Sequence, residues 1–121
     1  MNKINEYLNS RGDNVILVYI NNLAKTGRLD HAKKILKTIE RLENNELGLL
    51  LKIKLVKKLK GFNNIFELII NWKDANYRIF FSIIDNIFCL TNIFNKKRQK
   101  TSIKEIKLAE VRKKEIINNL K

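Results

Sequence analysis

Hydrophobic residues recur every three or four positions in the first half of the chain, which predicts two amphipathic helices. The first is expected over residues 15–25, and Gly27 is placed to end it. The second is expected over residues 30–45, with Asp30 as its N-cap. His31, the only histidine, lies in the first turn of this helix and is expected to be solvated.

The two ends of the chain add a strand and a third helix. Lys3 to Leu8 predict a short strand, and the polar turn after it offers Asp13 or Asn14 as the cap of the first helix. The last helix is expected to begin at Ser102, because Ser102 and Glu105 have the spacing of a capping box. Its broken apolar stripe consists of Ile103, Ile106, Ala109, Ile116 and Leu120. Its other face, expected to be solvated, carries Lys104, Lys107, Lys113 and Lys114.

From Leu49 to Val56 the spacing changes to two, and lysines alternate with aliphatic residues. This pattern predicts an extended strand whose basic face includes Lys52 and Lys54. A continuation of the preceding helix is the competing interpretation. Gly61 to Asn64 then form a turn.

Two hairpins follow, and their turns predict which residues pair. Asp85 and Asn86 are expected to form a two-residue turn that pairs Ile84 with its first neighbour, Ile87. Counted further outward, the same register pairs Tyr77 with Phe94. In the earlier hairpin, a loop from Lys73 to Asn76 pairs Trp72 with Tyr77.

Alternation then sorts the three strands into two faces. The apolar face, which is the expected core, holds Phe66, Leu68, Ile70, Trp72, Tyr77, Ile79, Phe81, Ile83, Phe88, Leu90 and Phe94. The mixed face, expected to be partly open or covered by a partner, holds Ile65, Glu67, Ile69, Asn71, Arg78, Phe80, Ser82, Cys89, Thr91 and Ile93. The elements together predict an α+β fold in one domain, residues 1–121, with an N-terminal strand, two helices, an antiparallel sheet of three further strands and a C-terminal helix.

Charge changes the picture, because the net charge of +13 is unevenly placed. Residues 1–51 have a net charge of +2 and residues 52–121 a net charge of +11. Such asymmetry favours an anionic polymer or an anionic surface as the partner. An A/T-rich gene, which enriches Ile, Asn and Lys together, is the alternative explanation for the total charge.

Other residues exclude several classes of function. The sequence has no glycine-rich phosphate loop, no Ser-His-Asp set and no metal-ligand cluster, so neither a cofactor nor a metal is expected. Cys89 is the only cysteine and is expected to be a buried sheet residue in a reducing compartment. The polar N-terminus and interrupted apolar runs predict a cytoplasmic protein without a membrane partner.

The remaining chemistry is cationic. Four cations stand within five residues between the last strand and the last helix, namely Lys96, Lys97, Arg98 and Lys100. Arg78 points away from the core, and Lys58 and Lys60 precede the first hairpin. If these segments converge on one sheet surface, they form a phosphodiester-binding site. A solvated Arg78 paired with Glu67 is the alternative.

Three strings carry a resemblance to a known family. They are Lys58-Leu59-Lys60-Gly61 with Phe66-Glu67-Leu68, then Tyr77-Arg78-Ile79-Phe80-Phe81, then Phe94-Asn95-Lys96-Lys97-Arg98-Gln99-Lys100-Thr101 with Glu105 and Ala109 behind it. Through them nearly the whole chain resembles the RelE/ParE toxin superfamily, and especially its HigB-like, phage-derived branch. The resemblance implies a toxin that cuts mRNA on the ribosome and is neutralised by, and assembles with, an antitoxin encoded beside it, often a helix-turn-helix protein.

Such cleavage uses the 2′-hydroxyl of the RNA as nucleophile, so the protein mainly orients the strand and stabilises the phosphorane. Arg78 is the expected bidentate phosphate ligand. Lys58, Lys60 and Lys97 complete the expected catalytic set, with Lys58 or Lys60 as a base if neighbouring cations lower its pKa. The expected RNA-binding residues are Lys52, Lys54, Lys96, Arg98 and Lys100.

Three positions depart from the family pattern. Ile69 stands where an Arg often follows the Glu-Leu pair, Asn92 where a His is frequent, and Ser102 where a Pro is usual. Loss of an Arg and an imidazole removes chemistry from the expected site. The departures motivate two alternatives: a toxin-fold protein that does not cleave, such as a gyrase inhibitor or degenerate toxin, and a phage-derived adaptor that only binds nucleic acid.

Overall fold

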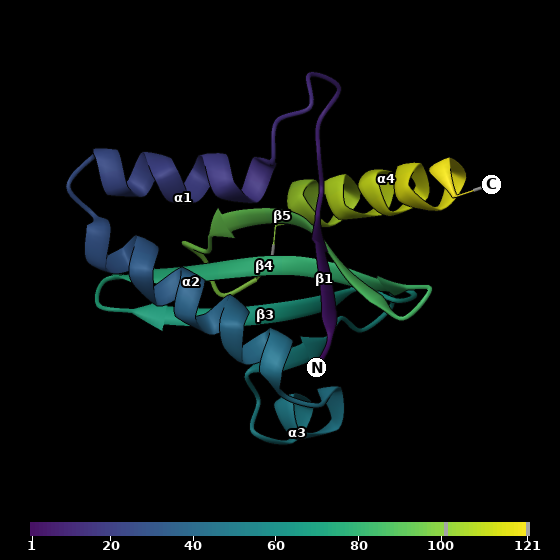
Figure 1. Ribbon diagram of the computed structural model, residues 1–121. Coiled ribbons are helices and arrows are strands. Elements are labelled where there is room, and N and C mark those ends of the chain that lie inside the picture. The colour runs from purple at the N-terminus through teal and green to yellow at the C-terminus, as the bar shows by residue number, and fades with distance from the viewer. Residues whose placement is uncertain (101, 121) are drawn as a thin grey trace.

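A computed structural model describes residues 1–100 and 102–120. The elements follow the chain as β1 (Lys3–Glu6), α1 (Val15–Lys25), α2 (Leu29–Asn44), α3 (Leu47–Lys52), β2 (Val56–Lys58), β3 (Phe66–Trp72), β4 (Ala75–Ile84), β5 (Ile87–Asn95) and α4 (Ile103–Asn119). They build a five-stranded sheet in the order β1-β5-β4-β3-β2 (Figure 1). β1 runs parallel to β5, and the other neighbours are antiparallel. The predicted α+β class is confirmed, but the sheet is mixed and a short helix, α3, is added.

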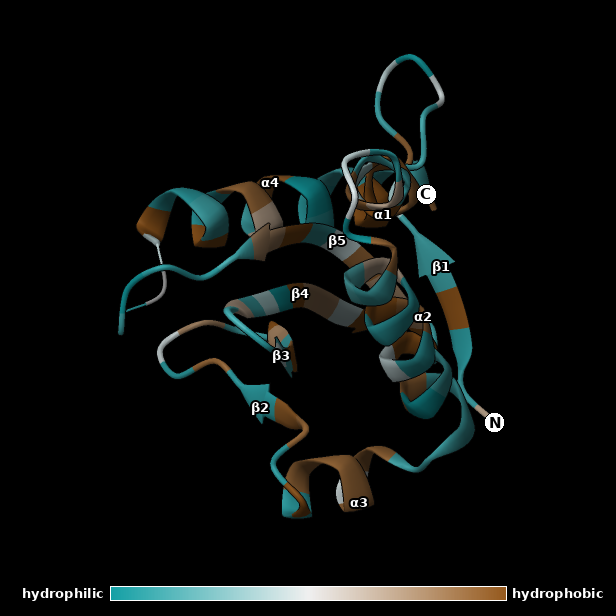
Figure 2. Cartoon of the chain, turned by 90° about the vertical axis from the view of Figure 1, so that its left-hand side faces the viewer, coloured by the Kyte–Doolittle hydropathy of each residue, from teal (hydrophilic) through white to brown (hydrophobic). Residues whose placement is uncertain are grey.

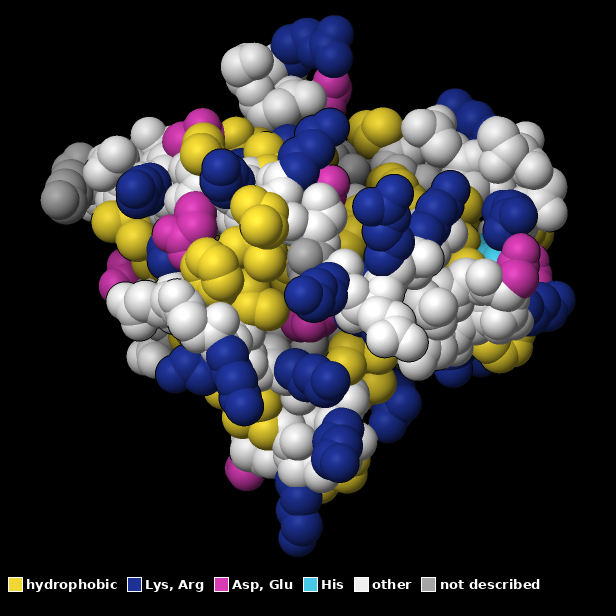
Figure 3. Space-filling model, turned by 180° about the vertical axis from the view of Figure 1, so that it is seen from behind, with side chains coloured by type: hydrophobic (Ala, Val, Ile, Leu, Met, Phe, Trp, Pro, Cys, Tyr) yellow, Lys and Arg dark blue, Asp and Glu magenta, His cyan; other side chains and the backbone are white. Residues whose placement is uncertain are grey.

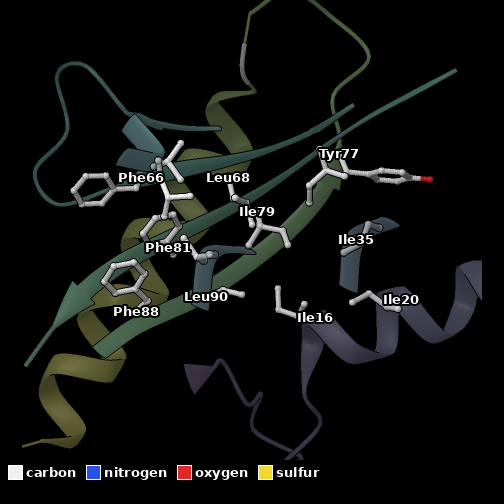
Figure 4. Packing of buried hydrophobic residues seen from close by; sticks show 14 of the residues in the cluster. Ile16, Ile20, Ile35, Phe66, Leu68, Tyr77, Ile79, Phe81, Phe88 and Leu90 are labelled. Carbon is white, nitrogen blue, oxygen red and sulfur yellow. The ribbon is translucent and has the colours of Figure 1, made fainter. Parts of the chain in front are cut away.

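The sheet lies between two helical layers. α1 and α2 pack on one face and α4 packs on the other, whereas the short apolar α3 projects beyond the sheet (Figure 2). The main core fills the space between the sheet and the α1–α2 layer. Its largest members include a row of aromatic rings in which Phe81 stacks between Phe66 and Phe88, with both centroid distances 5.3 Å (Figure 4).

The first two helices form as expected, but only one cap does. Asn14 caps α1, since its Oδ1 accepts hydrogen bonds from the backbone N–H groups of Ile16 and Leu17. The expectation that Asp30 caps α2 is wrong. Its carboxylate instead accepts a hydrogen bond from Trp72 Nε1 at 3.1 Å and pairs with Lys73 Nζ at 2.6 Å. The Lys73 contact, followed by the Trp72 hydrogen bond, holds the pKa of Asp30 well below its usual range.

The segment after α2 corrects the predicted strand over residues 49–56. Leu47–Lys52 form the separate helix α3, and Lys54 then adopts a left-handed conformation with φ 62° before β2 begins. Leu50 alone is fully buried in α3, while Leu49, Leu51 and Ile53 are exposed. The alternation was misleading because a short run of aliphatic residues can bury a leucine whether it forms a strand or a helix, so the pattern does not distinguish the two.

The two hairpins show how the size of a register error decides its consequence. In the first, Lys73 and Asp74 form a two-residue turn that pairs Trp72 with Ala75, so the predicted pairing of Trp72 with Tyr77 is wrong. The shift is two residues, and because side chains alternate with a period of two, Tyr77 still faces the core and is 1% exposed.

In the second hairpin the turn is confirmed. Asp85 and Asn86 both have positive φ, 51° and 63°, and Ile84 pairs with Ile87. A bulge then leaves Thr91 as an extra residue, and Tyr77 pairs with Asn95 instead of Phe94.

This one-residue shift moves Phe94 to the opposite face of the sheet. There its ring lies 5.3 Å from that of Phe80, in a second apolar cluster with Ile65, Ile106 and Ala109. The cluster lies beneath α4, so the mixed face is covered at this position by the chain's own last helix.

α4 is anchored differently from the prediction. In the described part of the chain, Ser102 makes no side-chain cap, and Glu105 Oε1 instead accepts a hydrogen bond from Asn92 Nδ2 at 3.1 Å. Lys113, expected to be solvated, is buried and donates to the Asn63 carbonyl at 2.7 Å. The helix is therefore fixed to the sheet and to the loop before β3 by polar contacts as well as by apolar packing.

Candidate nucleic-acid interface

The densest group of exposed cations lies on the connection between β5 and α4. The described residues of this β5–α4 loop, 96–100 and 102, line a cavity of about 940 Å³ together with Phe94, Asn95 and the first turn of α4. Its cations are Lys96, Lys97, Arg98, Lys100 and, in α4, Lys104. Glu105 is the one acidic residue in the lining, so the cavity is strongly basic. Thr101, part of the run that carried the family resemblance, lies outside the described residues.

Both ends of this loop are held by hydrogen bonds. At the β5 end, the backbone N–H of Lys96 donates to the Asn76 carbonyl at 2.7 Å, and the N–H of Asn76 donates to Asn95 Oδ1 at 3.1 Å. At the α4 end, Asn92 Nδ2 donates to Glu105. The cations therefore project from a segment whose ends are fixed, an arrangement suited to binding a polyanion.

Arg78 lies on the α4 face of the sheet, as expected, but it is not free. Its Nε lies 2.9 Å from Glu67 Oε1, and its Nη1 donates to Asn71 Oδ1 and to the Tyr77 carbonyl, both at 3.0 Å. The side chains of Arg78 and Glu67 are only 12% and 6% exposed. The Glu67 contact is an ion pair without hydrogen-bond geometry, and among the described residues Glu67 Oε1 has no hydrogen-bond partner. The alternative prediction, that Arg78 pairs with Glu67, is therefore confirmed, but the pair is buried and not solvated.

Arg78→Ala is expected to lower the free energy of unfolding by about 2–4 kcal/mol, because it leaves a buried carboxylate without its partner. The double variant Arg78→Ala/Glu67→Gln should recover most of this loss, since the uncompensated charge is then gone. Urea denaturation of the wild type, both single variants and the double variant measures the cycle. Lys57→Ala, which removes the exposed residue paired with Glu67 on β2, is the control and should change little. An Arg78→Ala variant as stable as the wild type would contradict this account.

The structure brings Lys58 and Lys60 neither to Arg78 nor to the β5–α4 loop. Lys58 pairs with Phe66 in the sheet and shares its face with the main core, whereas Arg78 lies on the α4 face. Lys60 follows β2 and lies near the level of Ser82, while Lys96 is bonded at the level of Asn76. Six residues of strand separate those levels, roughly 20 Å.

Lys52 and Lys54 also lie apart from the β5–α4 loop. Lys52 is exposed at the end of α3. Lys54 lines a cavity of about 380 Å³ with two cations of α2, Lys34 and Arg41, and with Asn71, the residue that accepts the hydrogen bond from Arg78. Arg78 itself is not part of this cavity lining. Ile69, where the family resemblance led us to expect an Arg, lines the same cavity with an aliphatic side chain.

Two residues to which the sequence analysis gave no functional role meet at the end of the sheet. His31, expected to be solvated, is 5% exposed, and its Nδ1 lies 2.9 Å from the hydroxyl of Tyr77. Beside them a polar groove of about 530 Å³ is lined by Arg28, Asp74, Lys96 and Lys97, among others. Amphipathic spacing hinted at this burial only weakly, because His31 lies next to the buried Ala32 on the apolar stripe of α2.

Basic side chains are spread over much of the face seen from behind, and acidic ones are fewer (Figure 3). Charge alone therefore does not distinguish one part of this surface, whereas the cavity and the fixed ends make the β5–α4 loop the candidate site. Within residues 1–100 and 102–120, no group of three or more His, Cys, Asp or Glu residues could hold a metal ion. In the same described ranges no helix has the length and apolar character needed to cross a bilayer.

Comparison with known families gives one result. The model of a family described as phage derived protein Gp49-like (DUF891) matches residues 19–114, about four fifths of the chain. The matched range starts within α1 and includes Arg78, the β5–α4 loop and most of α4. No curated protein and no solved structure matches the chain.

Proposed function

Because the chain belongs to the Gp49-like family of phage-derived proteins, part of the RelE/HigB-like toxin group, we propose that it is the toxin of a type II toxin–antitoxin pair. Within that group we assign it to the HigB-like branch. We propose further that it acts as a ribosome-dependent mRNA endoribonuclease in the cytoplasm, with an antitoxin, a helix-turn-helix protein encoded beside it, as its stable partner.

The observation that carries this proposal is the basic cavity beneath the β5–α4 loop. Lysine and arginine side chains on a fixed loop bind the sugar–phosphate backbone independently of sequence. The same cavity offers the ring of Phe94, and aromatic rings are the usual stacking surface for a single-stranded base. RNA is preferred to DNA as the substrate because RNA brings its own 2′-hydroxyl nucleophile.

In the proposed reaction the 2′-hydroxyl gives its proton to solvent and its oxygen attacks the adjacent phosphorus. The bond from phosphorus to the 5′-oxygen breaks, the 5′-oxygen takes up a proton from solvent, and a 2′,3′-cyclic phosphate remains. Lys97, with Lys96, Arg98 and Lys100, would orient the strand and stabilise the charge of the phosphorane. Arg78 could contribute only after releasing Glu67. Lys58 and Lys60 would act from other parts of the surface, against ribosomal RNA, as would Lys52 and Lys54.

A second candidate, a toxin-fold protein that does not cleave RNA, is supported by the state of three positions. Arg78 is occupied by Glu67, Ile69 is aliphatic, and Asn92 is buried between Thr91 and Glu105. None of them offers a free acid or base to a substrate. Gyrase inhibition and simple nucleic-acid binding are the corresponding activities.

Expression of the chain alone in bacteria tests the proposal. We expect growth arrest within minutes and new mRNA 5′ ends inside translated reading frames, mapped by sequencing of transcript ends. Co-expression of the neighbouring antitoxin should restore growth, and inhibition of translation should remove the new ends. Arrest with intact transcripts would refute the nuclease and favour the second candidate, and induced DNA damage would then identify gyrase as the target. Normal growth at full expression would refute the toxin itself.

A further inference from the structure

The polar groove at the end of the sheet lies beside the β5–α4 loop, on the side of the sheet that α1 and α2 cover. It is bounded by the end of α1, the β3–β4 turn and the end of β5, which lie on the same side of the molecule in Figure 1. Asn95, Lys96 and Lys97 line both this groove and the cavity beneath the loop. A single-stranded RNA bound along the loop therefore has a continuous path from the cavity into the groove.

The groove adds a third cation, Arg28, to the two lysines. Arg28 Nη1 lies 3.8 Å from Asp74 Oδ1, and the Arg28 side chain remains 45% exposed. Asp74 is the one acidic residue in the groove lining. Three cations against one exposed acid leave the groove with a net positive charge suited to a phosphate.

Arg28 shares the groove lining with Tyr77, one member of a buried aromatic pair. Burial raises the pKa of the Tyr77 hydroxyl, and the nearby guanidinium of Arg28 opposes that rise. On its other side the same hydroxyl meets His31 Nδ1 at 2.9 Å, while His31 Nε2 lies 3.9 Å from Asp74 Oδ1. The Asp74 carboxylate favours the tautomer with the proton on Nε2, in which Nδ1 accepts the hydrogen bond from Tyr77. Asp74 Oδ1 thus lies near both Arg28 Nη1, at 3.8 Å, and His31 Nε2, and it links the aromatic pair to Arg28.

We propose that this groove binds a second phosphate of the same single-stranded RNA, with Arg28 as the contacting residue and with Tyr77 and His31 as positioning residues. The inference rests on the proposed RNA-directed function. An acidic peptide of the antitoxin would also find cations here. RNA is favoured because the groove shares its lysines with the loop cavity, so that both phosphates belong to one path.

Binding of a fluorescein-labelled, 2′-O-methylated RNA dodecamer to the purified full chain, measured from 50 to 200 mM salt, tests this subsite. Arg28→Ala should weaken binding about five- to tenfold and reduce the magnitude of the salt slope by about 0.7, the share of one phosphate on a single strand. Asp74→Asn should tighten binding. Arg11→Ala is the matched control, because Arg11 is 83% exposed on a distant turn and its loss changes the net charge equally.

The positioning role has its own readout. Tyr77→Phe should weaken RNA binding when Arg28 is present and have no further effect in the Arg28→Ala background, with stability followed by thermal unfolding in each variant. Equal affinities of Arg28→Ala and Arg11→Ala, with Lys97→Ala still weakened, would overturn the groove and leave the RNA function standing. A wild-type protein without affinity for RNA would overturn both. Unchanged RNA binding by Arg28→Ala together with lost neutralisation by the antitoxin would assign the groove to the protein partner.

Discussion

Replacement of Lys96, Lys97, Arg98 and Lys100 by Gln in one variant is expected to abolish growth arrest and to weaken RNA binding on the order of a hundredfold. Four phosphate contacts on a single strand contribute roughly 2.8 to the salt slope, so most of the salt dependence should vanish with them. The measurements are growth after induction and RNA affinity at several salt concentrations.

The control for this variant removes the same charge from exposed positions elsewhere, with Gln at Arg11, Lys33, Lys37 and Lys114. This control should keep its toxicity and nearly all of its affinity, because diffuse charge contributes less than cations on one fixed loop. If both quadruple variants lose equal affinity, net charge explains binding, and the β5–α4 loop is not a site. Circular dichroism of both variants checks that they fold.

Phe81→Ala is expected to destabilise the protein by about 3–5 kcal/mol, the usual cost of removing a fully buried aromatic ring. Phe81 is 0% exposed and stacks on Phe66 and Phe88, so the vacated volume has neighbours on both sides that cannot readily collapse into it. Thermal unfolding should show a fall in Tm of roughly 10–20 °C.

Phe62→Ala serves as the reference for this measurement, since Phe62 is 39% exposed in the turn after β2. It should change stability by less than about 1 kcal/mol. A small effect of Phe81→Ala would mean that the aromatic row is not the centre of the core.

The cation-rich connection illustrates what composition can reveal. Charged side chains on a short connection between two elements are expected to stay in solvent, and Lys97, Arg98 and Lys100 are indeed exposed. The role of these residues stays a prediction, but their exposure followed from local sequence. The fate of Arg78 was harder to foresee, because the choice between a free and a paired guanidinium depends on Glu67 and Asn71 of the neighbouring strand.

His31 and the Thr91 bulge show the corresponding limit. The apolar stripe of α2 hinted at the burial of His31, but nothing within a few residues identifies its partner Tyr77, which is 46 positions away. The bulge is likewise invisible in the alternation of β5, yet it transfers Phe94 to the face covered by α4. The prediction that Lys60 lies beside the β5–α4 loop failed for a related reason. Both segments are basic, but the strand register places them at different levels of the sheet.

Local sequence alone determined the helices α1, α2 and α4, the turn at Asp85-Asn86 and the basic connection after β5, since periodicity, turn chemistry and charge act over a few residues. Only the tertiary structure decided which cations share a surface, that Arg78 is engaged by Glu67, and that Arg28 and Tyr77 line one groove. These outcomes depend on strand register and on burial of charge between distant segments, and both are properties of the assembled sheet.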